Sequence, residues 1–213
     1  MSRKARAAKI VAVLKKLFPR AKIILKYSHP WELLVAVVLS AQCTDKKVNE
    51  VTARLFHKYR KLADYIKANP KEFEKDVKPT GFYRAKTKSI LTSAKMVEEK
   101  FGGKVPCSMP ELLTLRGVAR KTANIILGNA CGKVEGIAVD THVRRLSLKL
   151  GLTGHNDPVK IEKDLMGLLP KKEWFKFTYR MIEYGRHICP ARKHECKNHP
   201  LSKIYHPAAK IWP

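Results

Sequence analysis

The chain has 213 residues, enough for one large domain or two smaller lobes with a real core. Lys and Arg number 44 against 18 Asp and Glu, a formal net charge of +26 that is spread along the chain. Such an excess repels itself unless a polyanion balances it, so we expect a nucleic-acid partner rather than an acidic membrane surface. Five cysteines form no dense framework, and no secretory profile is present. We therefore expect a cytoplasmic protein that binds no membrane and is nucleoid-associated if prokaryotic.

Helical periodicity dominates the chain, and no stretch alternates as a half-buried strand would. The apolar stripes that predict helices fall within residues 10–17, 31–41, 48–59, 90–101, 121–130, 143–150, 161–168 and 174–187. Ser108 and Glu111 form a capping box that opens a further helix. The segment 31–41 is apolar all round, as expected of a helix buried at a domain centre. The sequence therefore predicts an all-α fold.

The most informative segment is a glycine-bearing turn between two helical patterns, residues 115–121, with the sequence Leu-Arg-Gly-Val-Ala-Arg-Lys. A turn of this kind directs backbone N–H groups toward a phosphate at the start of a helix. Lys121 on the first turn of that helix can contact phosphate or act as a nucleophile. Asp140 follows nineteen residues later and precedes another helix, where it can serve as an N-cap, as a catalytic carboxylate or as both.

Together with Leu-Ser-Ala-Gln-Cys-Thr-Asp at 39–45 and Gly-Phe-Tyr-Arg-Ala-Lys at 81–86, these motifs resemble the endonuclease III family of helix–hairpin–helix DNA glycosylases. The resemblance covers roughly residues 20 to 196 in matching order. It implies two helical lobes with a DNA-binding cleft between them. One lobe would comprise residues 22–133, with the helix–hairpin–helix at about 108–130, and the other residues 1–21 plus 134–213.

The resemblance also implies roles for individual residues. Lys121 matches the family's catalytic lysine and Asp140 its catalytic aspartate. Gln42 matches the residue that fills the gap left by an extruded base, and Phe82 lies where the family has an apolar wedge, usually aliphatic. Both roles make physical sense, because an enzyme that attacks a sugar carbon must extrude the nucleotide and fill the opened stack. The full set of expected DNA contacts is Gln42, Phe82, Arg84, Lys86, Arg116, Gly117, Val118, Ala119, Arg120, Arg192 and Lys193.

The implied function is that of a bifunctional DNA glycosylase and abasic-site lyase, which excises oxidised pyrimidines from duplex DNA in base-excision repair. Its partner would be double-stranded DNA with a damaged base or an abasic site, bound by a monomer. Two alternatives remain open. One is a monofunctional mismatch or uracil glycosylase, which needs no nucleophilic amine. The other is a non-catalytic DNA-binding protein that uses the hairpin for phosphates alone.

The chain departs from the family pattern in the hairpin. The family usually has Leu-Pro-Gly-Val-Gly where this chain has Arg116 and Ala119 at the second and fifth positions. If the fifth position requires a positive φ, an alanine there costs about 1 kcal/mol. A phosphate contact from Arg116 would offset this cost.

The second departure lies near the C-terminus, where the family carries four cysteines spaced C-x6-C-x2-C-x5-C around a [4Fe–4S] cluster. Here Cys189 and Cys196 keep the first interval, but His199 and Tyr205 occupy the remaining two positions. We therefore expect no iron–sulfur cluster and no metal, with a zinc site as the alternative. The zinc ligands in that alternative are Cys189, Cys196, His199 and His206. Without metal, the segment would be held by apolar packing of Ile204, Tyr205, Ile211 and Trp212.

Overall fold

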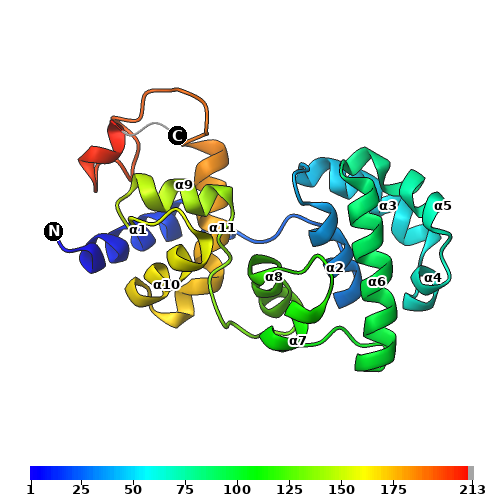
Figure 1. The fold of residues 1–213 in the computed structure, drawn as a ribbon. Coiled ribbons are helices and arrows are strands. Elements are labelled where there is room, and N and C mark those ends of the chain that lie inside the picture. Colours follow the sequence, from blue (N-terminus) through cyan, green and yellow to red (C-terminus); the bar gives the residue numbers. More distant parts are fainter. Residues whose placement is uncertain (211–213) are drawn as a thin grey trace. The chain divides into compact units, whose positions relative to one another are not determined.

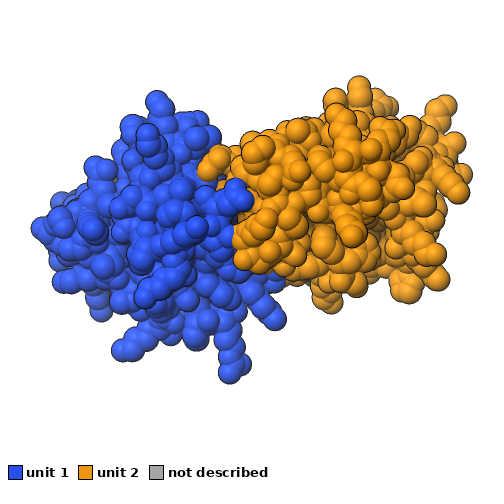
Figure 2. All heavy atoms as spheres, turned by 90° about the horizontal axis from the view of Figure 1, so that it is seen from below, with its two compact units in different colours: residues 1–23, 134–213 blue, residues 24–133 orange. Residues whose placement is uncertain are grey.

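The computed structural model describes residues 1–210, which form eleven α-helices and two short 3-10 helices, with no strand in that range (Figure 1). The all-α prediction is confirmed. No helix among the described residues has both the length and the hydropathy of a transmembrane span. The chain divides into two compact units, which Figure 2 colours separately: unit 1 comprises residues 1–23 and 134–213, and unit 2 comprises residues 24–133.

Unit 2 is built around one helix that is buried on every side. Its helices are α2 (Pro30–Leu39), α3 (Asp45–Lys58), α4 (Leu62–Ile66), α5 (Pro70–Val77), the 3-10 helix η1 (Lys78–Thr80), α6 (Tyr83–Phe101), α7 (Met109–Thr114) and α8 (Arg120–Ala130). Every residue of α2 from Trp31 to Leu39 is buried, and α3, α6 and α8 all pack against it. The apolar stretch predicted to be a central helix therefore has that position.

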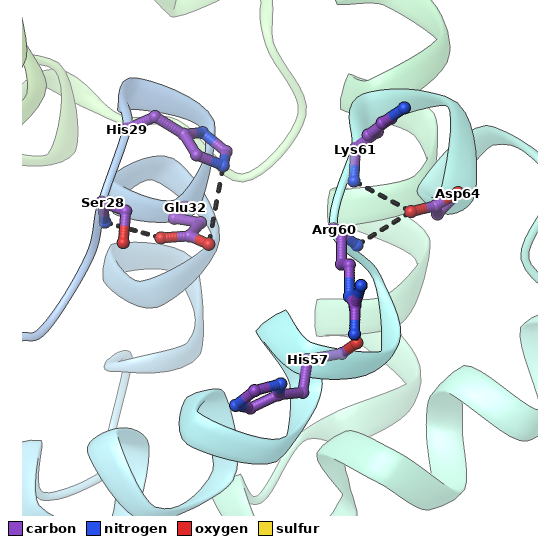
Figure 3. A network of polar contacts seen from close by, with 7 residues as sticks. All are labelled: Ser28, His29, Glu32, His57, Arg60, Lys61 and Asp64. Atoms are coloured by element: carbon purple, nitrogen blue, oxygen red, sulfur yellow. Dashed lines mark hydrogen bonds and ion pairs between the residues drawn. The ribbon is translucent and has the colours of Figure 1, made fainter.

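In two of these helices, a carboxylate of the first turn accepts hydrogen bonds from the backbone just before the helix (Figure 3). In α2, Glu32 accepts a hydrogen bond from the backbone N–H of Ser28 and lies 3.5 Å from the ring of His29. In α4, Asp64 accepts from the backbone N–H groups of residues 60 and 61 at 2.8 and 2.9 Å. Acidic groups at these positions pair the backbone N–H groups just before each helix and complement its dipole.

Unit 1 joins the N-terminal helix to the C-terminal third of the chain. Its helices are α1 (Arg3–Leu17), α9 (Thr141–Lys149), α10 (Pro158–Leu168), α11 (Lys171–His187) and the 3-10 helix η2 (His206–Ala209). The apolar faces of these helices share one core. The buried carboxylate of Glu173 on α11 also pairs with Lys15 of α1 at 2.6 Å and with Arg180 of its own helix at 2.9 Å. Burial alone would raise the pKa of Glu173, but the hydrogen bonds from these two cations outweigh it and lower that pKa.

A disulfide joins Cys107 to Cys131 at the open end of the α7–α8 hairpin. Cys107 directly precedes Ser108, the N-cap of α7, and Cys131 is the C-cap of α8. The hairpin is thus closed at one end by its turn and at the other by a covalent bond. No pattern in the sequence indicated this pairing. The other three cysteines, Cys43, Cys189 and Cys196, carry free thiols.

Replacing Cys107 and Cys131 together by serine should lower the free energy of unfolding by about 3 kcal/mol, because the bond closes a loop of 24 residues in the unfolded chain. Urea unfolding of the oxidised protein, with and without a reductant, measures this difference. Cys43→Ser is the matched control and should keep the full response to reductant. An unfolding curve of the wild type that reductant leaves unchanged would contradict the prediction.

Candidate functional site

The turn between α7 and α8 requires glycine at position 117. Gly117 has a φ of +80°, and a Cβ there would lie 2.9 Å from both Cβ and Oγ of Ser89 on α6. Leu115 and Val118 on either side are buried and anchor the turn. Ser93 on α6 adds a hydrogen bond to the carbonyl of Arg116 at 3.1 Å. The turn is therefore held against α6 by both packing and hydrogen bonding, and any side chain at position 117 would displace it.

Ala119 does not carry the backbone strain considered in the sequence analysis. It is the N-cap of α8 with a φ of −94° and a ψ of 172°, an extended conformation open to any residue. No side chain caps α8 at this position, whereas Thr44, Ser108 and Asp157 cap α3, α7 and α10. No side chain at the N-cap therefore accepts a hydrogen bond from the first N–H groups of α8. These groups suit an external anion.

Lys121 is the second residue of α8, and its side chain is exposed. Ala123, Ile126 and Leu127 form the buried face of this helix, so the helical period places position 121 away from the core. Arg116 is also exposed, and Arg120 is half-buried. The start of α8 thus offers an amine and backbone N–H groups on one accessible surface of unit 2.

Asp140 is the N-cap of α9 in unit 1. Its Oδ1 accepts a hydrogen bond from the backbone N–H of Val143 at 2.8 Å, and the residue is half-buried. The helix dipole favours a negative charge at this position. The capping role considered in the sequence analysis is therefore present, and it fixes the orientation of the carboxylate.

Gln42 and Phe82 share an unusual backbone conformation. They are the two non-glycine residues with positive φ within residues 1–210, at 52° and 47°. Both are exposed, and Phe82 keeps 65% of its surface accessible although it is a large apolar residue. The left-handed region costs about 1–2 kcal/mol for such residues, and strain of this kind clusters at functional sites.

Lys86 holds together the two segments that carry these residues. Its side chain is buried, and its ammonium donates to the carbonyl of Leu39 at 2.8 Å and to that of Thr80 at 2.7 Å. Leu39 precedes Gln42 by three residues, and Thr80 precedes Phe82 by two. Burial lowers the pKa of Lys86. The predicted phosphate contact is therefore replaced by a structural one, and Lys86 is not among the DNA contacts proposed below.

The remaining predicted cations lie on surfaces. Arg84 is exposed on the first turn of α6, and its guanidinium lies 5.7 Å from the ring centre of Tyr83. Arg192 and Lys193 are exposed in the segment after α11. All three are free to meet solvent or a polyanion.

The C-terminal segment brings together metal-binding side chains that differ from those of the zinc alternative. Cys189, His194, Cys196 and His199 each place one donor atom within 4.8 Å of the others, whereas His206 is exposed and belongs to no such group. His194 was missed, although the spacing C-x4-H-x-C-x2-H could have indicated it.

Two of the four apolar residues predicted to pack at the C-terminal end lie within the described part of the chain. Ile204 and Tyr205 pack against the core of unit 1, as predicted. Ile211 and Trp212 lie outside the described residues.

Comparison with known proteins agrees with the fold and the hairpin. Residues 35–171 match the model of the HhH-GPD superfamily base excision DNA repair proteins. Endonuclease III of Synechocystis sp. is 49% identical over 203 residues, which are 95% of this chain and 93% of that protein. A non-covalent endonuclease III–DNA complex and a trapped endonuclease III–DNA covalent intermediate each superpose with a TM-score of 0.93 at 43% identity, and each covers 99% of this chain. The covered shares of those two chains are 98% and 99%. The chain therefore belongs to the endonuclease III family, within the HhH-GPD superfamily of base excision DNA repair proteins.

Proposed function

We propose that this endonuclease III family member removes oxidised pyrimidines from duplex DNA and then cleaves the abasic strand by β-elimination. The observation that carries this proposal is the exposed amine of Lys121 at the start of an uncapped hairpin helix. A relative that is 43% identical has been solved as a trapped covalent intermediate with DNA, which supports nucleophilic chemistry in a chain of this fold.

In this mechanism the unprotonated Nζ of Lys121 forms a bond to C1′ of the sugar while the damaged base leaves with the bonding electron pair and gains a proton. Opening of the sugar ring gives a protonated imine between Nζ and C1′. The imine makes the C2′ proton acidic, and its removal expels the 3′ phosphate by β-elimination. Hydrolysis of the remaining imine releases Lys121.

Asp140 would stabilise the positive charge that develops on the sugar and accept a proton during the attack. Its cap to Val143 engages Oδ1, and Oδ2 is the oxygen that would face the sugar. Lys121 belongs to unit 2 and Asp140 to unit 1. The proposal therefore requires both units to act on the same nucleotide.

Gln42 and Phe82 would fill the stack opened by the extruded nucleotide. A base step that loses its partner is costly to leave empty, and an inserted side chain recovers part of that loss. Their exposure and left-handed backbone support this role, because both side chains are accessible and strained backbone of this kind clusters at functional sites. Arg116, Arg120, Arg84, Arg192 and Lys193 would contact phosphates together with the N–H groups of residues 117–119.

Lys121→Ala should abolish the covalent adduct that borohydride traps between the wild-type protein and a duplex containing thymine glycol or an abasic site. We expect turnover to fall about a thousandfold or more, because no other side chain replaces the nucleophile. Lys104→Ala, an exposed lysine of the same unit outside the hairpin, is the control and should trap normally. Base release by the wild type without any adduct would indicate a monofunctional glycosylase, and binding without release a non-catalytic protein.

Asp140→Asn should separate the capping role from the catalytic one. Asparagine caps a helix as well as aspartate does, so the melting temperature and the DNA dissociation constant should stay close to those of the wild type. Loss of the charge should lower single-turnover cleavage by about a hundredfold to ten-thousandfold. An equal loss of DNA affinity and of cleavage would contradict the catalytic role.

Lys86→Met should disturb the two strained turns by removing the hydrogen bonds to Leu39 and Thr80. We expect base excision from a thymine glycol duplex to slow about tenfold, equivalent to ~1.4 kcal/mol, because the turns no longer support nucleotide extrusion. Strand cleavage at a preformed abasic site should fall less, since no base has to be extruded there.

The matched control is Lys88→Met, which removes an exposed lysine two residues further along α6. It should change neither rate by more than the loss of one surface charge would. Equal slowing of both reactions by Lys86→Met would show that the hydrogen bonds of Lys86 to Leu39 and Thr80 do not act on nucleotide extrusion.

A further inference from the structure

Four side chains near the C-terminus converge on one point in unit 1. Cys189 and Cys196 are buried, His194 and His199 are half-buried, and their donor atoms all lie within 4.8 Å of one another. The Sγ of Cys196 is 3.2 Å from Nε2 of His194. Two thiols and two imidazoles that meet in this way form a complete set of ligands for a metal ion.

The iron–sulfur cluster of the family does not fit these residues. A [4Fe–4S] cluster is held by four thiolates that surround a cube of iron and sulfide. In this chain His199 and Tyr205 stand at the third and fourth ligand positions. The donor atoms of Cys189, His194, Cys196 and His199 also lie too close together to surround a cube of four iron and four sulfide ions.

We propose that Cys189, His194, Cys196 and His199 bind a single zinc ion. Zn–S bonds of about 2.3 Å and Zn–N bonds of about 2.0–2.1 Å in a tetrahedron place the donor atoms roughly 3.3–3.8 Å apart. Small side-chain movements bring the observed group to this size. A tetrahedral Cys2His2 donor set is typical of structural zinc sites.

The imidazoles are arranged as metal ligands usually are. Nδ1 of His194 lies 2.6 Å from the carbonyl of Arg192, so that a proton on Nδ1 is donated to this carbonyl and the lone pair of Nε2 points to the site. A ligand histidine typically makes such a hydrogen bond through its second nitrogen. Nδ1 of His199 is buried and has no hydrogen-bond partner among the described residues. A bound ion would satisfy this nitrogen.

The charges around the site also suit this ligand set. Zn²⁺ with two thiolates and two neutral imidazoles has no net charge, so its binding adds little repulsion in a strongly basic chain. The ammonium of Lys149 lies 3.1 Å from Sγ of Cys196, and Nη1 of Arg145 lies 3.8 Å from Sγ of Cys189. These N–H donors lie within hydrogen-bonding distance of the two sulfur atoms, as groups around a metal-bound thiolate often do.

The ion would fix the segment that presents Arg192 and Lys193. His194 holds the carbonyl of Arg192 directly, and the ligands at 189 and 196 close the segment at both ends. That these two cations then meet DNA rests on the proposed function. Metal binding itself does not, so a failed metal site and a failed repair activity can be told apart.

The test is metal analysis of the full chain, produced without a polyhistidine tag. Mass spectrometry should find about one zinc ion per chain and no matching iron. Cys196→Ser and His199→Ala should lose most of this zinc, whereas His206→Ala, the matched control outside the group, should keep it. Co²⁺ added to the chelator-treated wild type should give the visible d–d bands of tetrahedral coordination by sulfur and nitrogen.

Several results would overturn the proposal. Stoichiometric iron with an absorption band at about 400 nm would show a cluster instead. Equal loss of zinc in His206→Ala would refute the ligand set. If Cys196→Ser does not fold, the cobalt titration of the wild type decides: a folded apoprotein, checked by circular dichroism, that develops no d–d bands and takes up no zinc has no such site.

Discussion

The buried helix α2 is the constraint on which the DNA-facing parts of unit 2 depend. An apolar helix covered on every side can be placed in only one way, and the segments attached to its C-terminal end are placed with it. The Gln42 turn follows it directly, and Lys86 binds the carbonyl of Leu39 at its end. The hairpin turn also lies beside it, since a Cβ on Gly117 would be 3.9 Å from the side chain of Val38. Three segments distant in the sequence are thereby fixed from one rigid element.

This arrangement explains how two strained turns can persist. Left-handed backbone at Gln42 and Phe82 costs a few kcal/mol in total, and such strain survives only where the surroundings determine the conformation. The hydrogen bonds of Lys86 supply that determination from inside the protein. A buried ammonium with carbonyl acceptors is a demanding choice, because burial disfavours its charge. This ammonium joins the two turns. The cost of burying it therefore falls where the proposed extrusion step needs a rigid backbone.

The sequence predicted those features that depend on local patterns. Long apolar stripes indicated α2, α6 and α11, and Ser108 caps α7 as the predicted capping box requires. The short helices α4 and α5 were missed because they bury only Tyr65, and Phe73 with Val77, which are too few apolar positions to show a helical period. Glycine at 117 could be identified from its neighbours, whereas the extended backbone of Ala119 could not, since a family pattern gives no φ value.

Features that depend on contacts between distant segments were beyond the sequence. Lys86 looks like any basic residue near a turn, and only the folded chain shows its two carbonyl partners. The bond between Cys107 and Cys131 joins residues 24 positions apart, and the cysteine count gave no reason to pair them. The zinc alternative contained His206, which follows the family's fourth ligand position, and did not contain His194, which lies between the first two. In the structure, His194 is the histidine that lies close to Cys189, Cys196 and His199.

Packing and metal binding have different tasks at the C-terminal end. Cys189, Cys196, Leu201 and Ala208 belong to the apolar core of unit 1, so the chain on both sides of the segment 190–195 is held without any ion. The segment itself is largely exposed and cannot be ordered by burial. Ligands at 189, 194, 196 and 199 restrain its interior, where apolar contacts are absent. The proposed metal would therefore order a loop whose two ends are already anchored in the apolar core of unit 1.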